Sequence, residues 1–241
     1  MVIVEKIRAH EKDILTKQTP CLCPNGKSTH RVFTLHERRH RLFHVIIDSL
    51  VHTIESFPGQ WKCSVCKMTF TFYPEYALPY KRYVKDHCFS FSQAYLEDDT
   101  ETYRSVSSAI GYTTRTPVCV QPRTGRQEID DRMLAGPTVW RWLSFFGSLK
   151  NTLRNAFDLI RQTSRDFRVF RQISPIHPRK YQSNERKTLL QHALRLLHAE
   201  SAYRNLFGFS FFPDLATKNS WSSVTITSTF NKACPHANGE R

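Results

Sequence analysis

The sequence predicts an α+β fold in which a small N-terminal zinc ribbon is followed by a mainly α-helical, helix-turn-helix-like region. Two closely spaced cysteine pairs, Cys21/Cys23 and Cys63/Cys66, bracket strand-like sequence, as the two knuckles of a zinc ribbon do. Apolar residues then recur at helical spacing between residues 82 and 197. We therefore expect four parts: a zinc-ribbon domain (1–80), a helix-turn-helix-like domain (81–147), a C-terminal helical region (148–212) and a flexible tail (213–241).

Within the first part, Ile3, Ile7 and Ile14 form a short apolar pattern that predicts a helix. The range 31–57 is rich in β-branched residues toward its end, which favours strand, with helix as the alternative. Phe57-Pro-Gly-Gln60 predicts a turn, and the alternation of Thr69-Phe-Thr-Phe-Tyr73 predicts another strand.

The second and third parts carry helical patterns with recognisable ends. We expect helices over 82–96, from Asp99 or Thr100 to a stop at Gly111, from Gly136 onward, over 148–171, and from Ser183 or Asn184 to Leu197. The expected buried positions include Val139, Trp142 and Leu143 in the third helix and Leu189, Leu190, Ala193, Leu194 and Leu197 in the last. The range 112–133 has little periodicity and predicts a loop.

The charge of the chain indicates an anionic partner. Its 241 residues include 35 Lys and Arg against 21 Asp and Glu, a formal net charge of +14. A field of that sign attracts polyanions, of which nucleic acids are the commonest, although a merely basic globular protein is the alternative. No apolar stretch approaches the roughly 20 residues that span a bilayer, and the N-terminal residues, which include acids and no long apolar segment, are not expected to form a secretory signal. We expect a cytoplasmic, nucleoid-associated protein with reduced thiols.

The C-x-x-C sequence Cys63-Ser-Val-Cys66 is the best candidate metal site, because such a spacing presents two thiolates to one Zn²⁺ ion. Cys21 and Cys23 are expected to complete a structural site, and Lys62 and Lys67 would offset thiolate charge. Other readings stay open. A nearby histidine could replace one cysteine of the first pair, or Cys63 and Cys66 could form a redox pair. The histidines in question are His30, His36, His40 and His44, of which the last three would stack on one face of a helix.

The sequence WKCSVCKMTFTFYPEYALPYKRY resembles the motif C-x2-C-x2-T-F-x3-P-x4-P-Y-x-R-Y of a family of small zinc-ribbon proteins of unknown function that transposable elements encode. The matching positions are Cys63, Cys66, Thr69, Phe70, Pro74, Pro79, Tyr80, Arg82 and Tyr83. The resemblance covers roughly residues 19–147 and implies an earlier cysteine pair and a later helix-turn-helix. Similar N-terminal regions occur on insertion-sequence transposases, so the resemblance also implies a role in transposition and a transposase as partner.

A helix-turn-helix is expected from Ser107, which precedes Gly111 by four residues, and from Thr138-Val-Trp-Arg-Trp-Leu143 as recognition helix. Thr138, Trp140 and Arg141 would then face the major groove of DNA. The 26 residues from Tyr112 to Pro137 stand where a tight turn belongs, and a plain helical bundle is the alternative. Further phosphate contacts are expected from Arg115, Arg123 and Arg126 in this insertion and from Lys150, Arg154, Arg161, Arg165 and Arg168 on the following helix.

No catalytic constellation emerges from the sequence. The acids do not follow buried strands as the carboxylates of a transposase nuclease would, and no Gly-rich phosphate loop is present. We therefore expect a non-catalytic, zinc-containing DNA-binding protein associated with a transposable element. The alternative is a helical assembly subunit or transposase remnant that binds a transposase, or itself, through the apolar stripe of residues 149–197.

Overall fold

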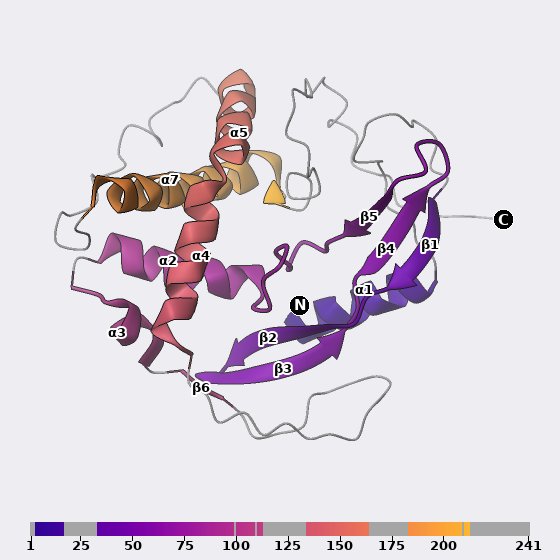
Figure 1. The fold of residues 1–241 in the computed structure, drawn as a ribbon, viewed down its shortest axis with the longest axis horizontal. Coiled ribbons are helices and arrows are strands. Elements are labelled where there is room, and N and C mark those ends of the chain that lie inside the picture. Colours follow the sequence, from indigo (N-terminus) through magenta and orange to yellow (C-terminus); the bar gives the residue numbers. More distant parts are fainter. Residues whose placement is uncertain are drawn as a thin grey trace.

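The computed structural model describes residues 3–16, 33–98, 100–108, 110–112, 134–163, 183–208 and 210–212. It confirms a mixed α+β fold with small sheets (Figure 1). The elements are α1 (Ile3–Leu15), β1 (Phe33–Arg38), β2 (Arg41–Ile47), β3 (Leu50–Ser56), β4 (Gly59–Cys63), β5 (Thr69–Phe72), α2 (Lys85–Glu97), α3 (Tyr103–Ser108), β6 (Gly111–Tyr112), α4 (Gly136–Ser148), α5 (Lys150–Thr163) and α7 (Asn184–Phe207).

The five longer strands form two small sheets. The first has the order β1-β4-β5 and is antiparallel throughout. The second pairs β2 with β3 through a two-residue turn, Asp48-Ser49, in which both residues have positive φ angles of 50° and 62°. Two consecutive positive φ values match the right-handed twist of a tight hairpin. The range 31–57 is therefore strand, as favoured, but it contributes to both sheets.

Two strands were not predicted. The predicted turn Phe57–Gln60 ends at Pro58, because β4 begins at Gly59. Trp61, in the middle of β4, is only 1% exposed. The predicted helix stop at Gly111 is wrong. Helix α3 ends at Ser108, and Gly111 instead begins β6, which runs parallel to β3. The Gly111 N–H donates a hydrogen bond to the Ser49 carbonyl at 3.0 Å.

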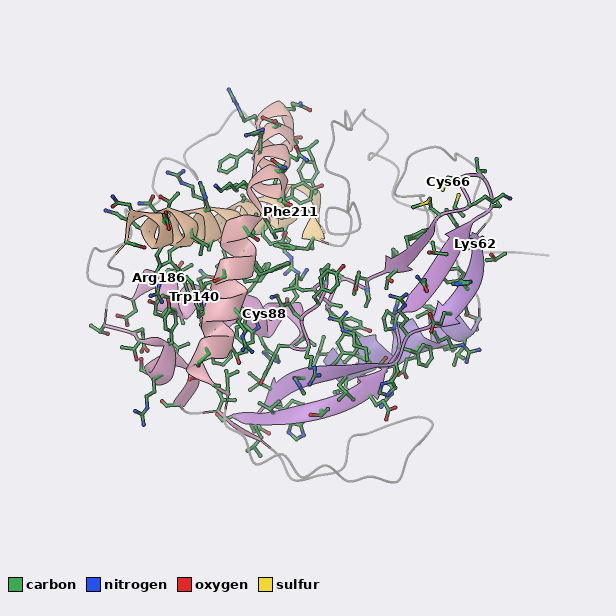
Figure 2. The ribbon with its side chains drawn as sticks, viewed as in Figure 1. Lys62, Cys66, Cys88, Trp140, Arg186 and Phe211 are labelled. Carbon is green, nitrogen blue, oxygen red and sulfur yellow. The ribbon has the colours of Figure 1, made fainter. Side chains whose placement is uncertain are left out.

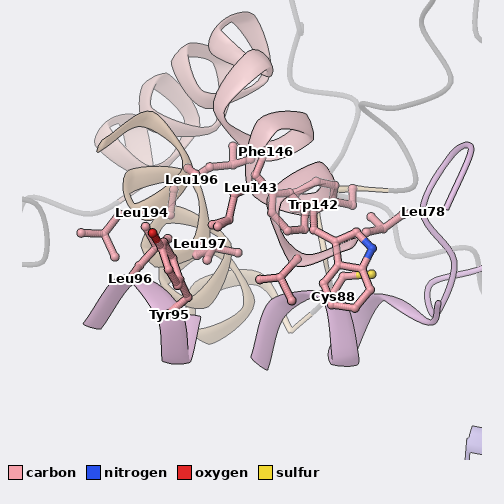
Figure 3. Close-up of a cluster of buried hydrophobic side chains, with 14 of the residues drawn as sticks. Leu78, Cys88, Tyr95, Leu96, Trp142, Leu143, Phe146, Leu194, Leu196 and Leu197 are labelled. Carbon is pink, nitrogen blue, oxygen red and sulfur yellow. The ribbon is translucent and has the colours of Figure 1, made fainter. Parts of the chain in front are cut away.

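The helices α2, α4, α5 and α7 gather at the upper left of Figure 1 and the sheet of β1, β4 and β5 at the right, while β2 and β3 run along the lower edge between them. The hydrophobic core that these helices share confirms the residues predicted to be buried in α4 and most of those predicted in α7 (Figure 3). Val139, Trp142, Leu143, Leu190, Ala193, Leu194 and Leu197 are all buried, and Leu189 is partly buried. This core joins residues from the ranges 81–147 and 148–212 in one hydrophobic cluster.

The last two helices differ from their predicted bounds. Helix α5 begins at Lys150, after a break at Leu149, and the remainder of its predicted range beyond Thr163 lies outside the described residues. Helix α7 begins as predicted, since the Ser183 hydroxyl accepts a hydrogen bond from the Arg186 N–H. It continues past Leu197 to Phe207, and Gly208 ends it with a φ of 77°. The predicted tail, 213–241, lies outside the described residues.

Candidate zinc and nucleic-acid sites

The C-x-x-C sequence forms the tip of a β-hairpin. Strand β4 ends at Cys63 and β5 begins at Thr69, with the Cys63 N–H donating to the Met68 carbonyl and the Lys67 N–H donating to the Cys63 carbonyl, both at 3.0 Å. Lys67 has a φ of 60°, which lets the chain reverse directly after Cys66. The turn is therefore tight and hydrogen-bonded, and its two cysteines do not form a disulfide with each other.

Both thiols belong to one apolar cluster at this end of the sheet. Cys63 is fully buried with Phe33 and Trp61. Cys66, labelled in Figure 2, is partly exposed and packs against the same group. Phe33 is the first residue of β1 and pairs directly with Cys63 across the sheet. The chain that follows the first cysteine pair thus enters the sheet beside Cys63.

The other predicted ligands are not assembled by the described residues. Cys21, Cys23 and His30 lie outside them, and the described part of the chain contains no group of three or more His, Cys, Asp or Glu side chains suited to a metal. His36, His40 and His44 lie on or between strands, so they do not stack along a helix. His40 pairs with Glu55, and the buried His44 lies with its Nδ1 3.1 Å from the Thr53 hydroxyl.

Helix α4 presents its predicted DNA-facing residues in different environments. Arg141 is exposed and Thr138 is half-buried. Trp140 is also half-buried, and the Arg186 guanidinium lies 4.3 Å from the centre of its ring (Figure 2). The Tyr103 ring lies 6.0 Å from the Trp140 ring, centre to centre, and is tilted against it. Because Arg186 also donates a hydrogen bond to the Tyr103 hydroxyl at 3.1 Å, this cluster of three side chains links the start of α7 to α3 and α4.

The basic face predicted for residues 150–168 is exposed as far as the structure describes it. Lys150, Arg154 and Arg161 are exposed on α5. Burial, followed by the positive charges of Lys150 and Arg195, lowers the pKa of His192 on α7. The other predicted phosphate contacts, Arg115, Arg123, Arg126, Arg165 and Arg168, lie outside the described residues.

A buried ionic cluster was missed by the sequence reasoning. Lys85 at the start of α2 and Glu200 on α7 are each only 1% exposed, with the Lys85 Nζ 3.7 Å from the Glu200 Oε1. The Arg204 Nε lies 3.0 Å from the same oxygen, although it is not aligned for a hydrogen bond. Burial lowers the pKa of Lys85, and the neighbouring charge of Glu200 opposes that effect. No local pattern marked these residues, because a Glu within a helix ordinarily faces solvent.

Comparisons with known protein families, with curated proteins and with solved structures give no match to this chain. Among the residues that the structure describes, no helix combines the length and the apolar character needed to cross a membrane.

Proposed function

We propose that this chain is a non-catalytic, zinc-containing DNA-binding protein associated with a transposable element. The observation that carries the proposal is the hairpin tip that holds Cys63 and Cys66 at the end of a three-stranded antiparallel sheet. The net charge of +14 supports a polyanionic partner. The link to transposition is supported by the motif resemblance around these cysteines.

The donor set fits a structural zinc ion. Cys63 and Cys66 supply two sulfur ligands from one tight turn, and Zn²⁺ bound by thiolates and imidazoles prefers four ligands. Cys21 and Cys23 would supply the other two, because the chain after them enters β1 beside Cys63. A bound Zn²⁺ would cross-link the segment before β1 to the hairpin. A site closed by four protein ligands has no open position for substrate, which is why we assign it a structural role.

Replacing Cys63 by serine is expected to abolish stoichiometric zinc binding. Serine lacks the thiolate that Zn²⁺ prefers, so the remaining ligands would hold the ion weakly. Native mass spectrometry of the full chain would measure this as one zinc per wild-type chain and none in the variant. Cys88→Ala is the matched control, since Cys88 is an equally buried thiol in the helical core. A wild-type chain without zinc, or a Cys63→Ser chain that retains it, would overturn the zinc site.

DNA binding is expected to weaken steeply as salt increases, because exposed cations of α5 and α7 would release counterions from DNA. In the double variant Lys150→Gln/Arg154→Gln, the plot of log affinity against log salt should be less steep by about 1.8, or about 0.9 for each lost phosphate contact. Fluorescence anisotropy with labelled duplex DNA measures both quantities. Arg39→Gln is the control, since the exposed Arg39 lies on the β1–β2 turn, 3.5 Å from Glu37. Absent or salt-independent binding would refute the proposal.

The alternative of an assembly subunit has less support. It requires the apolar stripe of residues 149–197 to face a partner. Among the described residues, Leu153, Ala156 and Ile160 of α5 are buried, as is most of the α7 stripe, which packs in the chain's own core.

A further inference from the structure

The turn between β5 and α2 carries a tyrosine that is both exposed and conformationally unusual. The Tyr80 side chain is 81% exposed, and the residue has a φ of 61°. Bulky residues with Cβ atoms rarely adopt positive φ, and such outliers cluster at functional positions. Its neighbours Leu78 and Pro79 are buried. The fold thus anchors the turn and directs the aromatic ring into solvent.

The turn is held in place by an arginine from a distant strand. Arg41 of β2 donates hydrogen bonds from one guanidinium nitrogen to the Leu78 carbonyl at 2.7 Å and to the Lys81 carbonyl. The Lys81 N–H also donates to the Leu78 carbonyl at 3.2 Å, which closes the turn. Since the backbone on both sides of Tyr80 is fixed in this way, the turn would be preorganised for a ligand. Binding would then cost little further conformational freedom of the backbone.

Three cations lie in this turn or on the helix packed against it. Lys81 and Arg82 follow Tyr80 directly, and the Lys81 Nζ lies 4.6 Å from the centre of the Phe145 ring on α4. Arg141, one helical turn before Phe145, is exposed. Burial lowers the pKa of Lys81, and the positive charge of Arg141 lowers it further. Within the described part of the chain, none of these three cations lies in a salt bridge.

We propose that Tyr80, Lys81, Arg82 and Arg141 form a binding site for unpaired DNA bases. In this site Tyr80 stacks on a base, and the three cations contact the adjacent phosphates. An exposed aromatic ring next to cations that no described carboxylate pairs with suits single-stranded nucleic acid, because every base has an aromatic face and every linkage a negative charge. A base within a duplex has both faces covered by its neighbours, so a duplex cannot use the ring in this way. This inference rests on the proposed DNA-binding function, and it adds to that function a specific site and a preference of that site for single-stranded DNA.

The test compares two ring-removing variants with one that keeps the ring. Asparagine and glycine both tolerate positive φ, so Tyr80→Asn and Tyr80→Gly remove the ring without straining the turn, and Tyr80→Phe retains it. Fluorescence anisotropy with labelled oligothymidine of about 20 nucleotides, which exceeds the usual footprint of one small domain, would measure affinity. Tyr80→Asn and Tyr80→Gly should lose roughly five- to 150-fold in affinity, while Tyr80→Phe stays near wild type. Duplex affinity should not change, and the urea midpoint should not fall.

The charged groups are tested separately through salt. The variant Lys81→Gln/Arg141→Gln should make the salt plot for oligothymidine less steep by about 1.4, or about 0.7 per contact on a single strand. Unchanged oligothymidine affinity in both ring-removing variants would overturn the inference and leave duplex binding intact. An equal loss for duplex and single strand would overturn the assignment to unpaired bases. A wild-type chain that binds neither form of DNA would refute the inference together with the proposed function.

Discussion

Replacing Glu200 by alanine is expected to lower the free energy of unfolding by about 3–5 kcal/mol, the usual cost of removing one partner from a buried ion pair. Glu200 is the only carboxylate within ion-pair distance of Lys85 that is itself buried, as far as the described residues show; Glu75, 3.9 Å from the Lys85 Nζ, is 56% exposed. The loss would leave the Lys85 ammonium in a nearly solvent-free position. It would also remove the acceptor, Glu200 Oε2, for the Phe211 N–H at 3.2 Å.

Urea unfolding followed by tryptophan fluorescence would measure this change. Asp158→Asn is the matched control, because it removes an exposed acid from helix α5 and should change stability by less than about 0.5 kcal/mol. The double variant Lys85→Met/Glu200→Leu should recover much of the loss, since replacing both charges with apolar groups leaves no buried ion uncompensated. A loss below about 1 kcal/mol for Glu200→Ala would show that solvent reaches Lys85.

The parts of the fold that follow from local sequence were predictable. The inward face of α4 comes from apolar residues at helical spacing, and Val139, Trp142 and Leu143 are buried as expected. The start of α7 was likewise fixed by a local rule, because the Ser183 hydroxyl caps it. The end of α7 was not predictable. After Leu197 the sequence turns polar at Glu200 and Ser201, yet the helix continues because Ala199, Ala202 and Tyr203 face the core.

The missed elements depend on residues far apart in the chain. Strand β6 is only two residues long and pairs with β3, about 60 residues earlier, so no local pattern marks it.

The candidate sites differ in the same way, since one follows from a local motif and the other from residues far apart in the chain. The hairpin that carries Cys63 and Cys66 follows from a short motif, and its turn is closed by its own backbone. The site around Tyr80 needs Arg41 from β2 and Arg141 and Phe145 from α4, so its geometry emerges only in the folded chain.

Replacing Gly147 by alanine is expected to destabilise the chain by about 2 kcal/mol or more, although alanine is the better helix former by about 1 kcal/mol. Gly147 lies in the last turn of α4, where a Cβ atom would stand 2.3 Å from the Leu189 carbonyl oxygen and 2.6 Å from the Leu189 Cγ. The first of these atoms belongs to the backbone of α7, so a side-chain rotation cannot relieve the contact. The two helices would have to move apart, and the core between them would lose packing.

Thermal unfolding followed by circular dichroism should therefore show Tm reduced by roughly 5 °C or more in Gly147→Ala. Ser148→Ala, at the adjacent exposed position, is the control and should leave Tm nearly unchanged. The double variant Gly147→Ala/Leu189→Ala separates the two contacts. It removes the Leu189 Cγ but keeps the carbonyl oxygen, so it should not restore wild-type stability. If Gly147→Ala instead raised Tm, as helix propensity alone predicts, α4 and α7 would not approach at this glycine, and the shared core would have to be assembled differently.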